Sequence, residues 1–221
     1  MLRKMIRFSS RKVEFQRFLR RLFDGSYSQY GEDLIIDKLL NNKSTGFYVD
    51  IGASHPIKFN NTYMFYVRGW NGINIDPNPT SKQAFDILRP RDINYTLGIA
   101  NKTATMPFYM ISDSMYSTFS KEEANESVLG GKTLDGVIDI KVKKLKDVLA
   151  KEKIKEIDFM SVDTEGYDYE VLQSNDWSKY KPIVLCVECH ADADKINDFL
   201  AKKGYKRVFK ETNSIFVLKG R

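Results

Sequence analysis

The chain has 221 residues, of which 42% are hydrophobic and 13% aromatic, and its net charge is +6. This length and composition predict one substantial domain with a buried core and exclude an intrinsically disordered chain. No stretch approaches the roughly 20 apolar residues that a membrane-spanning helix needs, and the first residues lack the apolar run of a secretory signal. We therefore expect a cytoplasmic protein.

The basic charge is concentrated near the N-terminus. Residues 1–23 contain eight Lys and Arg against Glu14 alone, whereas the remaining residues include 27 basic and 28 acidic side chains. A nucleic-acid-binding domain carries its basic patch on the fold itself, so the near-neutral body argues against a nucleic-acid partner. Apolar residues alternate with the cations, which is typical of a basic amphipathic helix. Such a helix either lies on an anionic membrane, here the inner face of the cell membrane, or packs on its own domain. We expect this extension over residues 1–25 and the main domain over 26–221.

After a turn at residues 24–26, the pattern alternates helices with strands. Apolar periodicity predicts helices over residues 34–40, 144–151, 167–173 and 192–203. Runs of β-forming residues, several of them bounded by glycine or proline, predict strands over residues 46–52, 72–76, 93–99, 103–110, 157–163 and 182–188. A terminal hairpin is expected from residues 205–209 and 214–218. The polar segment 112–136 fits either a lid that faces the substrate or a disordered surface loop.

This alternation predicts an α/β fold, a mostly parallel sheet with helices on both faces. The terminal hairpin is expected to add an antiparallel strand at one side. In such a sheet, ligands bind at the carboxyl ends of the strands. A purely structural sheet does not need many acidic strand ends, so we expect a ligand site where they meet. Four predicted strands end in acidic residues: Asp50, Asp76, Asp163 with Glu165, and Glu188 with His190.

The first two strand ends indicate the kind of cofactor. Gly52 lets the backbone turn tightly after the first strand and approach a ligand. Asp76 lies 24 residues later, the position of an acid that accepts hydrogen bonds from ribose hydroxyls. Residues 52–56 contain one glycine where a dinucleotide-binding loop has three, so they fit a pyrophosphate poorly. A cofactor with a ribose but no phosphates, such as S-adenosylmethionine, fits better than the alternative of a nicotinamide-dependent oxidoreductase.

Longer motifs carry a resemblance to the FkbM family of S-adenosylmethionine-dependent methyltransferases, from Ser28 to about Val217. The strongest is Ile-Asp-Phe-Met-Ser-Val-Asp-Thr-Glu-Gly-Tyr-Asp-Tyr-Glu-Val-Leu at 157–172. The others are Ser-Gln-Tyr-Gly-Glu-Asp (28–33), Phe-Tyr-Val-Asp-Ile-Gly-Ala (47–53), Asn-Thr-Tyr (61–63) and Gly-Trp-Asn-Gly-Ile-Asn-Ile-Asp-Pro (69–77).

The resemblance implies a Rossmann-like class I methyltransferase fold, with a seven-stranded sheet whose last-added strand is antiparallel. It also implies O-methylation, commonly of sugars in glycans or of polyketide products, and hence a hydroxyl of a sugar or small molecule as acceptor. A non-catalytic membrane- or partner-binding protein on the same fold is the other alternative. The residues expected to contact the cofactor are Gln29, Asp50, Gly52, Ala53 and Asp76.

A hydroxyl is a poor nucleophile, so its attack needs proton removal or polarisation by a metal. The only two histidines, His55 and His190, both follow predicted strands at the ligand end. A histidine base is one option, since its pKa lies near working pH. The other is Mg²⁺ or Mn²⁺ held by Asp163, Glu188 and His190. Glu165 is expected to be an acid of a helix N-terminus without a catalytic role.

Overall fold

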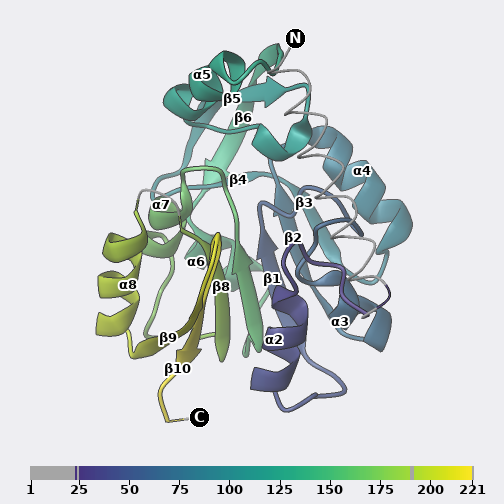
Figure 1. Ribbon diagram of the computed structural model, residues 1–221, viewed down its shortest axis with the longest axis vertical. Helices are drawn as coiled ribbons and strands as arrows, with labels where there is room; N and C mark the ends of the chain where they lie inside the picture. The colour runs from purple at the N-terminus through teal and green to yellow at the C-terminus, as the bar shows by residue number, and fades with distance from the viewer. Residues whose placement is uncertain (1–22, 24, 190–191, 221) are drawn as a thin grey trace.

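The computed structural model describes residues 23, 25–189 and 192–220 (Figure 1). The basic extension expected over residues 1–25 lies almost entirely outside the described residues, and so does His190. The helical elements are α2 (Glu32–Leu39), α3 (Tyr63–Arg68), α4 (Pro79–Leu88), η1 (Ser114–Tyr116), α5 (Lys121–Leu129), α6 (Leu145–Lys151), α7 (Asp168–Gln173) and α8 (Ala193–Lys202). The strands are β1 (Phe47–Ile51), β2 (Asn71–Asp76), β3 (Ile93–Thr96), β4 (Gly98–Ile99), β5 (Ala104–Ile111), β6 (Leu134–Lys143), β7 (Phe159–Val162), β8 (Val184–Glu188), β9 (Tyr205–Lys210) and β10 (Asn213–Leu218).

The main sheet has seven strands in the order β3-β2-β1-β7-β8-β10-β9. All pairings are parallel except those of β10, which runs antiparallel to both of its neighbours. The α/β fold and its single antiparallel strand are therefore confirmed. The terminal hairpin lies at one side of the sheet, as expected, with β10 between β8 and the edge strand β9. Ile215 and Phe216 are buried on opposite faces of β10, as expected of an inner strand. Lys206 and Lys210 are exposed on β9, and such charged side chains are typical of an edge strand.

Helices cover both faces of this sheet, as the alternation predicted. Strand β1 shows why: its side chains alternate between two apolar cores. Val49 and Ile51 contribute to the core shared with α6, α7 and α8. Tyr48 points to the other face and joins the core shared with α2 and α3. Because the two cores lie on opposite faces of the sheet, buried packing holds β1, β7 and β8 from both sides.

A second, three-stranded sheet in the order β4-β6-β5 stands above the carboxyl ends of the main strands, with α5 beside it (Figure 1). The strand predicted over 93–99 divides at Leu97, and its last two residues join this second sheet. The polar segment 112–136 is no plain loop, since it contains η1, α5 and the start of β6. Phe108 and Phe119 pack in the core beneath the second sheet. Among the described residues, no helix is long and apolar enough to cross a membrane.

Candidate active site

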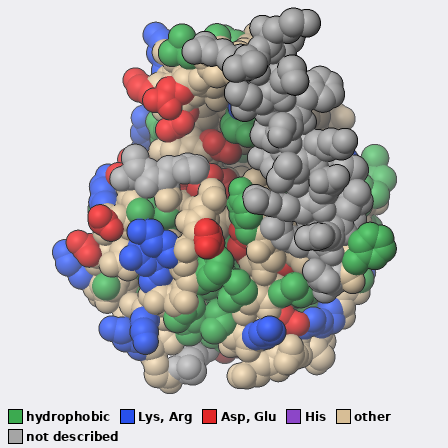
Figure 2. All heavy atoms as spheres, viewed as in Figure 1, with side chains coloured by type: hydrophobic (Ala, Val, Ile, Leu, Met, Phe, Trp, Pro, Cys, Tyr) green, Lys and Arg blue, Asp and Glu red, His purple; other side chains and the backbone are tan. Residues whose placement is uncertain are grey.

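A cavity of about 260 Å³ lies between the carboxyl ends of the main strands and the second sheet. Figure 2 shows acidic side chains recessed in the hollow below α5. Most of the residues expected at the ligand site do line this cavity: Gln29, Asp50, Gly52, Ala53, Asp76, Asp163 and Glu188. The strand-end pattern of the sequence therefore converges on one place in the fold.

His55 is not among the residues that line the cavity. It is exposed, and its Nδ1 accepts the backbone N–H groups of Ile57 and Lys58, both at 3.0 Å. Partial burial and the nearby Lys58 cation lower its pKa, so the ring is neutral at pH 7. The structure thus gives His55 the role of capping a turn next to the cavity. His190, the other histidine, lies outside the described residues.

Gly52 is the point at which the first strand meets the cavity. Its φ is +77°, and its N–H donates to the carbonyl of Ile75 at 2.9 Å. A Cβ atom at this position would lie 1.6 Å from the carbonyl oxygen of Asp163, so only glycine fits. Asp163 in turn donates its N–H to Ile51 O at 2.9 Å. The turn after β1 and the end of β7 are therefore in direct backbone contact.

Asp76, at the end of β2, is buried and fixed by two backbone donors. Its Oδ2 accepts the N–H of Ser54 and its Oδ1 that of Asn78, each at 2.8 Å. Burial raises the pKa of Asp76 to about 6, against the opposing effect of these N–H donors. Each carboxylate oxygen accepts more than one hydrogen bond, so Asp76 can still accept from ribose hydroxyls, as the sequence predicts.

Asp50 lines the cavity near the end of β1 and is held by two side-chain donors. Its Oδ2 accepts hydrogen bonds from the Asn60 amide at 3.0 Å and the Thr62 hydroxyl at 2.8 Å. Its Oδ1 has no hydrogen-bond partner within the described part of the chain. Neither Asn60 nor Asn61 was expected at the site, although both line the cavity and Asn61 begins a quoted motif. Asn61 bridges to Ser161 Oγ on β7 at 3.1 Å.

The segment before α2 brings Gln29 to the cavity. Asp33 accepts the hydroxyls of Ser26 at 2.5 Å and Ser28 at 2.9 Å, and the N–H of Tyr27 at 2.7 Å. These bonds fold the loop back onto the start of the helix. Burial raises the pKa of Asp33, which its hydrogen-bond donors oppose. The serine and acidic positions of this motif are therefore structural, and they present Gln29 to the cavity.

Three carboxylates meet at one place in the cavity. Atoms of Asp163, Glu165 and Glu188 lie within 4.8 Å of one another, close enough to share a cation. Burial, followed by the charges of Glu188 and Glu165, raises the pKa of Asp163 well above its usual range. Glu165 was expected to be an acid at a helix N-terminus, and this was wrong. Helix α7 begins only at Asp168, which accepts the N–H of Thr164 and closes a turn that turns Glu165 towards the cavity.

Aromatic residues also line the cavity, and the sequence identified them only in part. Tyr116 and Phe119 come from the 112–136 segment, for which a substrate-facing lid was one of two expectations. Phe108 on β5 and Tyr167 before α7 were not expected at the site, although Tyr167 belongs to the motif at 157–172. Phe119 packs against both of them, with ring centroids 4.9 and 5.9 Å apart. Part of the segment therefore faces the cavity, as expected of a lid.

These features fit S-adenosylmethionine. The buried Asp76 carboxylate suits a ribose, Leu97 and Ile99 provide apolar contact, and Gly52 leaves room that a side chain would fill. Asp50 would supply a carboxylate for a cationic group of such a molecule. Strand order and cavity together define a Rossmann-like methyltransferase fold of class I.

The family model described as the methyltransferase FkbM domain matches residues 50–207. The chain therefore belongs to the FkbM methyltransferase family, which implies the use of S-adenosylmethionine. This membership argues against the nicotinamide-dependent oxidoreductase that the sequence alone left open.

Two solved structures are similar to this chain at low identity. One is described as a candidate RNA methyltransferase from Pyrococcus horikoshii, with 8% identity and a TM-score of 0.40. The other is a precorrin-6y C5,15-methyltransferase from Geobacter metallireducens, with 9% identity and a TM-score of 0.38. Each alignment covers 84% of both chains. No curated protein matches the chain.

Proposed function

We propose that this methyltransferase acts on oxygen, and that its acceptor is a sugar hydroxyl of a glycan or of a glycosylated small molecule. The contact between Gly52 and Asp163 carries the proposal. Gly52 belongs to the expected donor site, and the Asp163 carbonyl lies against its backbone. Both residues line the same cavity, so a carboxyl group with a raised pKa lies near the expected donor site, where a hydroxyl has to lose its proton.

When bound, S-adenosylmethionine supplies an electrophilic methyl group on a sulfonium. The chain has to orient the acceptor oxygen and accept its proton. His190, two residues beyond Glu188, is the base expected from the sequence. Asp163 supports the same role, because burial and the charges of Glu188 and Glu165 raise the pKa of its carboxyl group and so make its carboxylate a stronger base. Glu188 lies beside Asp163 and can hold the acceptor hydroxyl by a hydrogen bond.

A divalent cation is the alternative means of activating the hydroxyl. Carboxylate oxygens are the ligands that Mg²⁺ and Mn²⁺ prefer, and Asp163, Glu188 and His190 were the expected set. Asp163, Glu165 and Glu188 bring carboxylate oxygens within 4.8 Å of one another, which supports this alternative. Their mutual repulsion, which helps to raise the pKa of Asp163, supports a shared proton equally well.

The cavity lining favours a hydroxylated acceptor with apolar ring faces. Aromatic side chains and carboxylates line the same cavity, which suits a ring whose edge carries hydroxyls and whose faces are apolar. Three neighbouring carboxylates also disfavour a phosphate beside the reacting oxygen. Together with the near-neutral body, this supports an acceptor other than nucleic acid.

Transfer to candidate acceptors tests the proposal directly. Purified protein is incubated with S-adenosylmethionine and either neutral glycans, nucleotide-sugars or amine-bearing analogues, and products are examined by mass spectrometry. We expect a gain of one methylene unit, lost when the reacting hydroxyl is replaced by hydrogen. Transfer to nitrogen alone would contradict O-methylation. Donor binding without transfer to any acceptor would favour the non-catalytic alternative.

We also propose that residues 1–23 bind an anionic membrane surface at its cytoplasmic face and leave the main domain autonomous. Deletion of residues 1–23 should release the protein from anionic vesicles and preserve turnover of a free acceptor. Vesicle binding that persists, or a main domain that no longer folds, would favour a helix packed on its own domain.

A further inference from the structure

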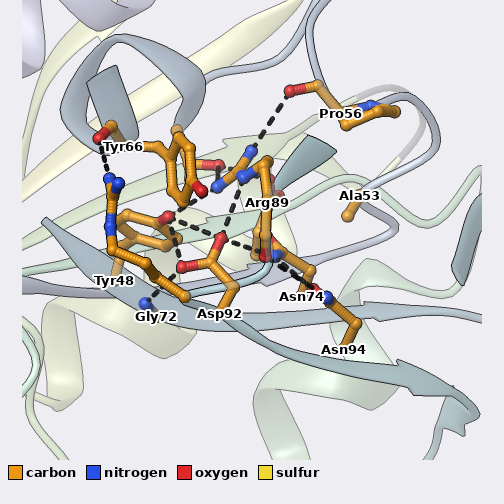
Figure 3. Close-up of polar contacts among 12 residues, drawn as sticks. Tyr48, Ala53, Pro56, Tyr66, Gly72, Asn74, Arg89, Asp92 and Asn94 are labelled. Atoms are coloured by element: carbon orange, nitrogen blue, oxygen red, sulfur yellow. Dashed lines mark hydrogen bonds and ion pairs between the residues drawn. The ribbon is translucent and has the colours of Figure 1, made fainter. Parts of the chain in front are cut away.

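Arg89 is a fully buried cation in a cluster close to the donor site (Figure 3). It caps the C-terminus of α4, which ends before Pro90 because the residue preceding a proline disfavours helical geometry. Its side chain has no exposed surface. A buried charge is costly unless it is paired and hydrogen-bonded. The surroundings of Arg89 must therefore compensate it.

All five N–H donors of the guanidinium are used. Nε donates to Asp92 Oδ2 at 2.8 Å, and Nη2 donates to the Tyr48 hydroxyl at 2.7 Å. The remaining donors reach the segment that follows Gly52: Pro56 O at 3.4 Å, Asn60 Oδ1 at 3.1 Å and Thr62 Oγ1 at 2.9 Å. Three of the five bonds thus hold residues 56–62.

Two of these partners are the residues that hold Asp50. The Asn60 amide and the Thr62 hydroxyl donate to Asp50 Oδ2, while Asn60 Oδ1 and Thr62 Oγ1 accept from Arg89. Asn60 and Thr62 therefore form a bridge between the buried cation and the carboxylate that lines the cavity. The other half of the fork is anchored on the sheet, because Asp92 also accepts the Gly72 N–H at 2.9 Å and the Tyr48 hydroxyl.

We propose that Arg89 is a positioning residue of the methyl-donor site: it holds Asn60 and Thr62, and through them it sets the orientation of the Asp50 carboxylate. Arg89 does not touch the donor. The proposal rests on the donor site and is independent of the acceptor chosen under "Proposed function". Lysine cannot replace arginine here, since its ammonium has three donors and lacks the planar fork.

A double-mutant cycle on donor-product affinity tests the proposal. Binding of S-adenosylhomocysteine is measured by calorimetry for the wild type, Arg89→Lys, Asp50→Asn and the double variant. We expect each single variant to weaken binding ~10- to 100-fold, the loss that corresponds to one or two hydrogen bonds to a charged group. The double variant should bind no more weakly than the weaker single one, because both changes interrupt the same connection.

Two further measurements separate positioning from general damage. With an acceptor in hand, Arg89→Lys should raise KM for the donor and leave kcat within ~3-fold, as expected when only ground-state binding is lost. Arg68→Lys is the matched control, since Arg68 pairs with Asp37 on the same face of the sheet and does not contact residues 56–62. It should leave donor-product affinity unchanged.

Thr62→Val keeps the shape of the side chain and serves if Arg89→Lys does not fold. It should weaken binding in the same way and be equally non-additive with Asp50→Asn. Unchanged affinity in folded Arg89→Lys or Thr62→Val would overturn the proposal. Losses that multiply in the double variant would do the same, because they would indicate independent damage. A wild type that does not bind S-adenosylhomocysteine would refute the donor site itself, whereas binding without O-methylation would refute only the proposed acceptor.

Discussion

Replacing Gly52 by alanine should disrupt the donor site and destabilise the fold together. The added Cβ would lie 1.6 Å from the carbonyl oxygen and 2.6 Å from the carbonyl carbon of Asp163. Both are backbone atoms, so no side-chain rotation relieves the overlap. The turn after β1 and the end of β7 must separate, and these two segments carry Ala53 on the donor side and the proposed base.

Two costs add up in Gly52→Ala. Holding a non-glycine residue at φ +77° costs about 1–2 kcal/mol, and overpacking a fixed site costs about 1–3 kcal/mol. The sum of about 2–5 kcal/mol corresponds to a fall in Tm of about 4–20 °C for a domain of this size. Donor-product affinity should fall ~10-fold or more, because the carbonyl displaced by the methyl group borders the cavity.

Gly69→Ala separates the two costs. Gly69 also has a positive φ, +108°, but a Cβ there would meet nothing within 4 Å. It should lower Tm by about 2–8 °C, from backbone strain alone, and leave binding of S-adenosylhomocysteine intact. Thermal unfolding and calorimetry on both variants provide the comparison. If Gly52→Ala lowers Tm no more than Gly69→Ala does and retains wild-type affinity, the inferred contact with Asp163 is wrong.

Three further predictions concern the acidic residues. Asp76→Ala should weaken S-adenosylhomocysteine binding by about 1.5–3 kcal/mol in calorimetry. The affinity of the wild type should decrease when the pH is lowered below 6, because the pKa of Asp76 is raised to about 6 and protonation removes an acceptor. Equal affinity at pH 5 and pH 8 would contradict this. Burial and then the charge of Glu188 raise the pKa of Asp168 to about 7, so the native state binds more protons than the unfolded state between about pH 4 and 7 and stability falls as pH rises. Asp168→Asn should therefore gain stability relative to wild type at pH 8 but not at pH 4 in thermal unfolding. Asp163→Asn should lower kcat ~10²- to 10⁴-fold and leave the affinity for the donor unchanged. If Asp163 or His190 is the base, turnover should survive EDTA. Loss of turnover with EDTA and its recovery with Mg²⁺ or Mn²⁺ would favour the cation.

Local sequence was sufficient for the strands and for the acids at their ends. In β1 and β8 nearly every residue is buried, and such runs of β-forming residues carry their own signal. A residue that ends a parallel strand lies at the ligand edge whatever the order of the strands. The sequence alone was therefore enough to assign Asp50, Asp76, Asp163 and Glu188 to one site.

The second sheet needed contacts that the sequence does not reveal. Strand β6 was not predicted, since polar residues interrupt its apolar ones and several of its side chains stay exposed. It is held by a long antiparallel pairing with β5, in which Ala104 pairs with Val142 at one end and Ile111 pairs with Leu134 at the other. Pairing between segments far apart in sequence depends on tertiary packing. The aromatic wall of the cavity, which β5 helps to build, was therefore only partly predicted.

The sequence by itself determined the sheet, the methyltransferase family and the acidic edge, because these depend on local patterns of burial and on motifs that are continuous in the chain. Tertiary structure alone decided which side chains near the strand ends reach the cavity. His55 follows a strand, yet it is exposed and caps a turn. Arg89 carried no signal, because charged residues are ordinarily at the surface. It is buried because acceptors from Tyr48, residues 56–62 and Asp92 converge on its five donors, and only the folded chain brings those segments together.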